Sequence, residues 1–267
     1  MIKIFSFSKQ LMKIIKNLVS FLYPQLVEAR KGNVTPYLEI RRSRGKYVLN
    51  SATVNYSFGG VHIIFETFFK KIDLGKFELK NVLILGMGAG SIISLLREKY
   101  PKECHITAVE KDPVVIELAE KYFDVRKNRL LKIIHDDAFS FASAAEEKYD
   151  LIISDLFVDE NVPDQFTTEE YLINLRRMSN KHCCIIYNKM TEKKIHKKKF
   201  EKIAVLFENI FSGSETHRLS AYGSENSLLF YNNLALLPEK TESEKTHKIT
   251  LKFLLQDSKP PNPIAPA

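Results

Sequence analysis

VLILGMGAGS, residues 82–91, carries the clearest fold signal in the sequence. Its apolar start is typical of a buried parallel strand, and Gly86, Gly88 and Gly90 follow at alternate positions. Glycine lets the backbone turn tightly and pass close beneath a ligand, because it has no side chain. Residues 91–100 then carry apolar side chains at helical spacing. The order strand, glycine loop, helix indicates a loop that binds a nucleotide cofactor.

Two further strands carry acidic residues at their ends. ITAVEKD, residues 106–112, predicts a second strand that ends in Glu110. This residue lies about twenty residues beyond the glycine loop, where a carboxylate can accept both ribose hydroxyls. A helix opens at Pro113, and LLKIIHDDAFSF then predicts a third strand that ends at Asp136 and Asp137. An aspartate at this place can hold an adenine amino group.

A fourth strand is predicted from YDLIISDLF, residues 149–157, and its carboxyl end at Asp155 should face the ligand crevice. After a polar loop, Thr167 is expected to cap a helix. CCIIYN predicts a fifth strand that ends at Asn188, and THRLSAY with NSLLFYN predicts a final antiparallel pair.

The segment before the central motif alternates apolar and polar residues over positions 36–58, with a turn at Arg44 and Gly45, which predicts a β-hairpin cap. Residues 61–72 then predict an amphipathic helix with His62 and Glu66 on one face. This pair can contact a substrate, and a surface hydrogen bond is the alternative interpretation. The candidate substrate-binding residues are Tyr56, His62, Asp159 and Asn188.

With 267 residues and 45% hydrophobic content, the chain is expected to form one ordinary core with a small appendage. The boundaries we predict are an amphipathic helix over 1–32, a hairpin cap and helix over 33–79, a cofactor-binding domain over 80–233 and a polar, disordered tail over 234–267. Three cysteines without metal spacing are typical of reduced thiols in a cytoplasmic protein, and no metal is predicted. The net charge is +8, but the lysines are scattered, so no nucleic-acid partner is expected.

The N-terminal stretch, residues 9–22, has an apolar stripe flanked by lysines. It is too short and too charged for a membrane span, and no cleavage site for a signal peptide follows it. We interpret it as a helix that docks on its own domain or on a partner subunit, as in a homodimer. Peripheral contact with a membrane is the alternative.

Taken together, VLILGMGAGS, AVEKDPVVIELAEKYF, HDDAFSF, and YDLIISDLF followed by VPDQFTTEEYLINL resemble the spermidine synthase-like branch of the class I S-adenosylmethionine-dependent methyltransferase superfamily. The resemblance spans roughly residues 80–188 and implies an α/β, Rossmann-like fold. That fold has a mostly parallel seven-stranded sheet, an antiparallel last strand and helices on both faces. It also implies that Glu110 binds ribose, that Asp137 binds adenine and that Asp155 is the catalytic residue at the transfer centre. The cofactor-binding residues that it implies are Gly86, Met87, Gly88, Ala89, Gly90, Glu110, Lys111, Asp136, Asp137 and Ala138.

Three departures from the family pattern affect the expected reaction. Aminopropyltransferases carry an aspartate inside the glycine loop, which suits the ammonium of decarboxylated S-adenosylmethionine, and here that position is Ala89. Their second aspartate after the fourth strand is displaced by one place to Asp159. Gly59 and Gly60 stand where an acidic pair is expected, and a basic chain would not steer polyamines toward itself.

Three hypotheses follow. The first is an S-adenosylmethionine-dependent methyltransferase with a small-molecule acceptor of unknown identity. The second is an aminopropyltransferase that makes spermidine from decarboxylated S-adenosylmethionine and putrescine, with Asp155 as base and Asp159 binding the amine. The third is a non-catalytic nucleotide-binding module or a nicotinamide-binding domain, because Gly86, Gly88 and Ser91 approximate a dinucleotide fingerprint.

Overall fold

The computed structural model describes residues 19–52, 55–100, 103–127 and 129–233, and for residues 55–57 only the backbone. The predicted N-terminal helix over 9–22 lies outside this part except for residues 19–22, which are helical. The predicted tail over 234–267 lies outside it entirely.

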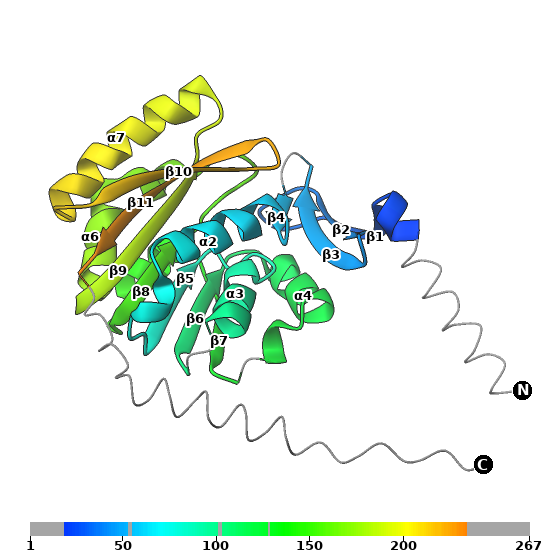
Figure 1. The fold of residues 1–267 in the computed structure, drawn as a ribbon, viewed down its shortest axis with the longest axis horizontal. Coiled ribbons are helices and arrows are strands. Elements are labelled where there is room, and N and C mark those ends of the chain that lie inside the picture. The colour runs from blue at the N-terminus through cyan, green and yellow to red at the C-terminus, as the bar shows by residue number, and fades with distance from the viewer. Residues whose placement is uncertain (1–18, 53–54, 101–102, 128, 234–267) are drawn as a thin grey trace, which may run out of the picture. The chain divides into compact units, whose positions relative to one another are not determined.

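The central sheet has seven strands in the order β10-β11-β9-β8-β5-β6-β7 (Figure 1). The parallel strands are β5 (Asn81–Leu85), β6 (His105–Glu110), β7 (Leu131–His135), β8 (Tyr149–Ser154) and β9 (Ser179–Met190). The last strand, β11 (Ser224–Asn232), pairs antiparallel with both β9 and β10 (Glu215–Ala221). This topology confirms the predicted mostly parallel sheet with an antiparallel last strand.

Helices cover both faces of this sheet, because successive residues of its buried strands point to opposite sides. In β5, Val82 and Ile84 enter the apolar cluster formed with α2 (Gly60–Lys71) and α3 (Ser91–Lys99). Leu83 and Leu85 enter the cluster formed with the helices of the other face. These are α5 (Ala138–Ala144), α6 (Glu169–Met178) and α7 (Lys194–Ile210). Helix α4 (Pro113–Tyr122) follows β6, and short 3₁₀ turns lie at η1 (Leu74–Lys76), η2 (Val125–Lys127) and η3 (Asp164–Thr167).

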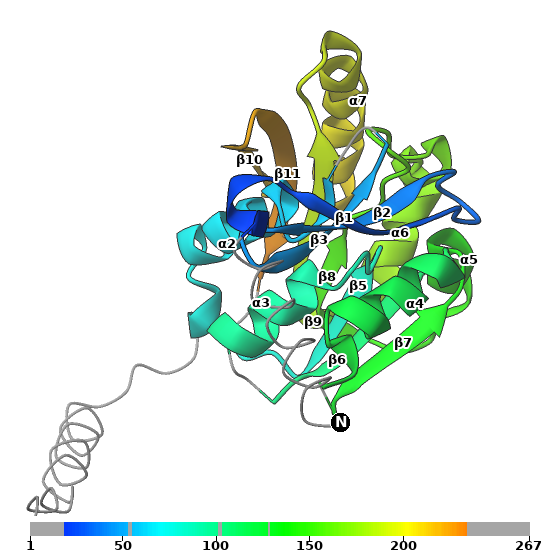
Figure 2. The same cartoon turned by 90° about the vertical axis from the view of Figure 1, so that its right-hand side faces the viewer.

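A second sheet precedes the central one and extends the predicted hairpin. It is antiparallel, with the order β1-β2-β3-β4, and its strands are β1 (Gln25–Arg30), β2 (Leu38–Ser43), β3 (Lys46–Ser51) and β4 (Asn55–Ser57). The predicted turn joins β2 to β3, with positive φ at Arg44 and Gly45. The sheet lies beside α4 (Figure 2). Leu38, Ile40 and Leu49 pack against the apolar residues of that helix.

Two local predictions are wrong. Residues 25–30 were expected to belong to a helix, but they pair with β2 as strand β1, so a long-range partner decides their structure. Thr168, and not Thr167, caps α6, because its Oγ1 accepts the Tyr171 N–H at 3.2 Å. The Thr167 hydroxyl instead donates to the Asp164 carbonyl.

No helix within the described residues is both long and apolar enough to cross a lipid bilayer.

Candidate active site

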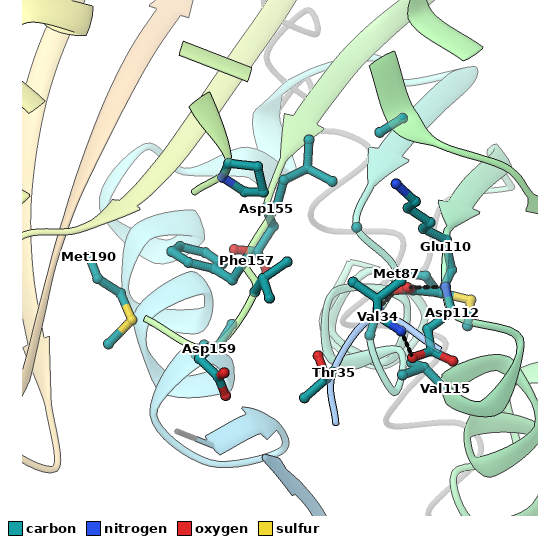
Figure 3. A pocket seen from close by; sticks show the side chains of 18 of the residues that line it. Val34, Thr35, Met87, Glu110, Asp112, Val115, Asp155, Phe157, Asp159 and Met190 are labelled. Carbon is teal, nitrogen blue, oxygen red and sulfur yellow. Dashed lines mark hydrogen bonds between the residues drawn. The ribbon is translucent and has the colours of Figure 1, made fainter. Parts of the chain in front are cut away.

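A cavity of about 640 Å³ opens where β5, β6 and β8 end, within the usual size range of ligand pockets. Its position agrees with the rule that open α/β sheets bind ligands at the carboxyl ends of their strands. Figure 3 shows Asp155, Phe157, Asp159 and Met190 on one side of it and Met87, Glu110, Asp112 and Val34 on the other. These two sides separate the candidate transfer centre from the candidate cofactor loop.

The glycine loop lies at the floor of this cavity. Gly86 has a φ of +88°, and a Cβ built on it would lie 2.2 Å from the carbonyl oxygen of Asp155. Only glycine permits this close approach of the two strand ends. The backbone N–H groups of Gly86 and Met87 both donate to the Val109 carbonyl, at 3.0 and 3.1 Å. The loop is therefore fixed to β6 on one side and to the end of β8 on the other.

Glu110, the predicted ribose ligand, lines the cavity and also holds the loop in place. One carboxylate oxygen accepts the Gly88 N–H and the other accepts the Asp112 N–H, each at 3.0 Å. Burial raises the pKa of Glu110, and these two N–H groups oppose that rise. A carboxylate oxygen has more than one lone pair, so both remain able to accept a ribose hydroxyl.

Asp112 is a site residue that the sequence interpretation missed. Its side chain is 2% exposed, and its Oδ1 caps α4 by accepting the Val114 N–H at 3.0 Å. Its Oδ2 accepts the Val34 N–H at 2.9 Å, which ties the segment before β2 to the start of α4. Val34 and Thr35 thereby line the cavity. The Asp-Pro sequence marks the helix cap, but no local pattern marks the long-range tie.

The carboxylates after β7 have distinct surroundings. Asp137 caps α5 by accepting the Phe139 and Ser140 N–H groups, and it forms an ion pair with Lys111 at 3.0 Å. Burial raises the pKa of Asp137, but Lys111 and the two N–H groups outweigh it and lower the pKa below its usual value. Asp136, beside it, is exposed at the cavity. The predicted adenine ligand thus serves as a helix cap, with Asp136 next to it.

Asp155 follows β8 directly and lies half-buried in the cavity wall. Its backbone N–H donates to the Leu85 carbonyl at 2.8 Å, which fixes it over the glycine loop. The Asn188 Nδ2 donates to its Oδ1 at 2.8 Å, and the Asn226 Nδ2 donates to the Asn188 Oδ1 at 2.9 Å. Burial raises the pKa of Asp155 to about 7, against the opposing effect of the Asn188 hydrogen bond. Asn226 was not predicted, because its role depends on the pairing of β11 with β9.

The predicted substrate-binding residues do not all meet at the cavity. Asp159 lines it, with a φ of +53° in the turn after β8. Asn188 lies behind Asp155 and is 1% exposed. His62 is absent from the described lining of the cavity. Its ring stacks on that of Phe58, with 5.6 Å between the ring centroids, and burial lowers the pKa of His62. The side chain of Tyr56 lies outside the described residues.

Ala89 is also absent from the described lining of the cavity. It is fully buried and packs in the apolar cluster that joins the N-terminal sheet to α4. The other members of this cluster are Leu38, Ile40, Leu49, Val114, Val115 and Leu118. An alanine at this loop position therefore belongs to the interface between the loop and the N-terminal sheet.

The charge of the cavity is opposite to that of the chain. Lys111 is the one basic side chain among the described residues that line it. The acidic side chains there are Glu110, Asp112, Asp136, Asp137, Asp155, Asp159, Glu160 and Glu192. The net charge of +8 therefore does not describe the field that a ligand meets, and the expectation that the chain would not attract polyamines loses its electrostatic basis.

The sequence model of the family described as the spermine/spermidine synthase domain matches residues 67–221. The chain belongs to this family. The match begins within α2 and ends with β10, so it includes the glycine loop, Glu110, Asp137 and Asp155. The resemblance inferred from the motifs is thereby confirmed.

Two curated relatives carry different activities in their names. A polyamine aminopropyltransferase of Vibrio vulnificus is 32% identical over 120 residues, which cover 44% of this chain and 40% of the relative. An eEF1A lysine and N-terminal methyltransferase homolog of Drosophila pseudoobscura is 29% identical over 108 residues, which cover 37% of this chain and 16% of the relative. The similarity thus spans less than half of either relative.

Solved structures show the same fold. A spermidine synthase in complex with the transition state analogue AdoDATO superposes with a TM-score of 0.65 at 14% identity, and covers 78% of this chain and 74% of that one. Human methyltransferase-like protein 13 in complex with SAH superposes with a TM-score of 0.52 at 20% identity, and covers 76% of this chain and 95% of that one. The class I S-adenosylmethionine-dependent methyltransferase fold is therefore shared by both kinds of transferase.

Proposed function

We propose that the protein transfers the methyl group of S-adenosylmethionine to an amine bound between Asp155 and Asp159. The observation that carries this proposal is the placement of Asp155, a half-buried carboxylate with a pKa of about 7 at the end of β8, across the cavity from Glu110. A group with a pKa near neutrality can take a proton at physiological pH. Relatives with both activities act on amines by their names.

The residues suggest a division of labour. Glu110 would hold the ribose, and Asp136 with Asp137 would lie at the adenine, so that the sulfonium lies between the glycine loop and Asp155. When bound, S-adenosylmethionine would supply the methyl group to the amine nitrogen, and the carbon–sulfur bond would break with its electron pair left on sulfur. Asp155 would accept the proton that the nitrogen loses. Alignment supplies most of the rate, and the carboxylate orients the nucleophile.

Two features favour ordinary S-adenosylmethionine as the donor. The glycine loop carries no carboxylate for the ammonium of the decarboxylated form, because residue 89 is alanine. Its methyl group packs in the apolar interface with the N-terminal sheet. Helix α2 begins at the cavity wall with Gly60 and Val61, without a capping side chain or an acidic residue in its first turn. Its backbone N–H groups and helix dipole suit the carboxylate of the methionine moiety.

Aminopropyl transfer is the second candidate function, and the acidic lining of the cavity favours it. Decarboxylated S-adenosylmethionine and a diamine both carry more positive charge than the methyl donor, so the carboxylates of Asp159 and Glu192 would attract them. In that reaction the amine nitrogen would attack the aminopropyl carbon next to sulfur, and the carbon–sulfur bond would break with its electron pair left on the sulfur of the released methylthioadenosine.

The proposed base can be tested with methyl-labelled S-adenosylmethionine and a panel of amines that includes diamines, lysine peptides and peptide N-termini. Asp155→Asn keeps the shape and the Asn188 hydrogen bond, so cofactor affinity should change by less than about twofold while turnover falls about a hundredfold. Asp164→Asn, an exposed aspartate absent from the described lining, is the matched control. Normal turnover in Asp155→Asn would remove the base from the proposal.

A further inference from the structure

A chain of two buried amides connects β11 to Asp155. Asn226 lies on β11 and Asn188 on β9, and they are 2% and 1% exposed. In the antiparallel pair, Asn226 is opposite Met190 and Asn188 is opposite Leu228, so the two amides are diagonal neighbours. The hydrogen bonds run from the Asn226 Nδ2 to the Asn188 Oδ1, and from the Asn188 Nδ2 to the Asp155 Oδ1.

The direction of this chain depends on Asn226. An asparagine side chain presents an N–H₂ group on one side and a carbonyl on the other. Asn188 can donate to Asp155 only when its carbonyl faces Asn226, which therefore has to present a donor. If Asn188 turned over, two oxygens would face each other at Asp155 and two N–H₂ groups would face each other at Asn226. Buried polar groups left unsatisfied in this way are strongly unfavourable.

We propose that Asn226 and Asn188 are positioning residues that fix the Oδ1 of Asp155 and reserve its other oxygen for the acceptor amine. The inference rests on the proposed role of Asp155 as the base and adds two residues that act through Asp155, of which Asn226 also lines the cavity. The donated N–H stabilises the charged carboxylate, which burial alone would disfavour. The two hydrogen-bonded amides, Asn226 and Asn188, are called the relay below. The relay thus keeps Asp155 able to accept a proton at neutral pH.

Other charged groups share the cavity with Asp155. Asn188→Leu leaves all of them unchanged, whereas Asn226→Asp adds one carboxylate. Glu110 and Lys111 lie at the end of β6, and Asp112 lies at the start of α4. Asp136 and Asp137 follow β7, Asp159 and Glu160 follow β8, and Glu192 follows β9. A shift in the Asp155 titration that also occurs in Asn188→Leu therefore reports on the amides and not on a new charge.

The test is a titration of the Asp155 carboxyl carbon by NMR in the full chain labelled at the aspartate carboxyl, with Asp155→Asn used to assign its resonance. Asn226→Asp replaces the donor by an acceptor, so Asn188 turns its N–H₂ toward the new carboxylate and its carbonyl toward Asp155. Only a protonated Asp155 can then donate to that carbonyl. The midpoint of the Asp155 titration should rise by about one pH unit or more.

Asn188→Leu removes the donor outright and should raise the midpoint in the same direction. The matched control is Ser227→Ala, which deletes a buried hydrogen bond to Thr191 next to Asn226 on the same strand but outside the relay. It should leave the midpoint unchanged. Thermal unfolding and calorimetric binding of S-adenosylmethionine establish that each variant is folded.

An unchanged midpoint in folded Asn226→Asp or Asn188→Leu would overturn the relay, as would an equal shift in Ser227→Ala. If Asn226→Asp does not fold, Asn188→Leu decides the matter. The titration needs no acceptor, so failure of the relay is distinct from failure of the proposed function, which shows as normal turnover in Asp155→Asn.

Discussion

Asp155 connects the stability of the protein to pH. Its pKa lies at about 7 in the folded protein, against an ordinary value of 3.8. Between pH 4 and 7, approximately, the folded state holds a proton that the unfolded chain has lost, so stability falls as the pH rises through this range. Asp155→Asn cannot ionise. It should match the wild type near pH 4 and exceed it by roughly 1–3 kcal/mol at pH 8, a figure reduced for solvent in the cavity.

Urea unfolding at the two pH values measures this difference, and Asp164→Asn at the exposed aspartate provides the baseline for a simple change in charge. A stability gain of equal size at both pH values would show that the ionisation of Asp155 is not its cause.

Ala89 shows how one small residue commits the glycine loop to the N-terminal sheet. Its methyl group is fully buried among Leu38, Ile40 and the apolar side chains of α4. Ala89→Asp should place an unpaired carboxylate in this cluster and destabilise the fold by about 3 kcal/mol or more. Chemical denaturation measures the loss, with Ala89→Ser as the milder polar control. A stable Ala89→Asp protein with stronger binding of decarboxylated S-adenosylmethionine would instead place this side chain at the cofactor.

At the scale of elements, Asp112 joins the start of α4 to the segment before β2. Asp112→Ser keeps a capping oxygen for the Val114 N–H but releases the Val34 N–H, whereas Asp112→Ala loses both. We expect Asp112→Ser to retain most of the stability and yet to bind S-adenosylmethionine about threefold to tenfold more weakly, because Val34 and Thr35 line the cavity.

Calorimetry gives the affinity, and limited trypsin digestion at exposed Lys31 reports the release of the segment. Full affinity and unchanged cleavage in Asp112→Ser would mean that the Val34 hydrogen bond does not hold this wall of the cavity.

The elements that sequence predicts well are those whose signals are local. The glycine loop, Glu110 at the end of β6 and the positive-φ turn at Arg44 and Gly45 each carry their pattern within a few residues. Strand β1 was missed because its structure comes from pairing with β2, eight or more residues later.

The same division holds for the candidate site. Asp155 could be placed because a parallel strand ends there, and Asn188 because the next strand ends nearby. Asn226, the Asp112 tie and the apolar surroundings of Ala89 all depend on contacts between segments distant in sequence. Periodicity does not encode such contacts, so only the folded arrangement shows them.

At the scale of the whole molecule, a chain with a net charge of +8 folds around an acidic cavity. Apart from Lys111, the described basic residues are absent from its lining. Lys193, the N-cap of α7, and Lys199 on α7 instead form ion pairs with Glu160 and Asp164, which follow β8. This separation of charge suits a cationic acceptor and a sulfonium donor, because both meet carboxylates inside the cavity. It does not by itself distinguish methyl from aminopropyl transfer.

Calorimetric titration of the full chain with S-adenosylmethionine and with its decarboxylated form, under identical conditions, distinguishes methyl transfer from aminopropyl transfer. The donor carboxylate would meet the uncapped start of α2, and no loop carboxylate is present for the decarboxylated ammonium, so S-adenosylmethionine should bind about tenfold more tightly. Tighter binding of the decarboxylated form would contradict methyl transfer and favour polyamine synthesis.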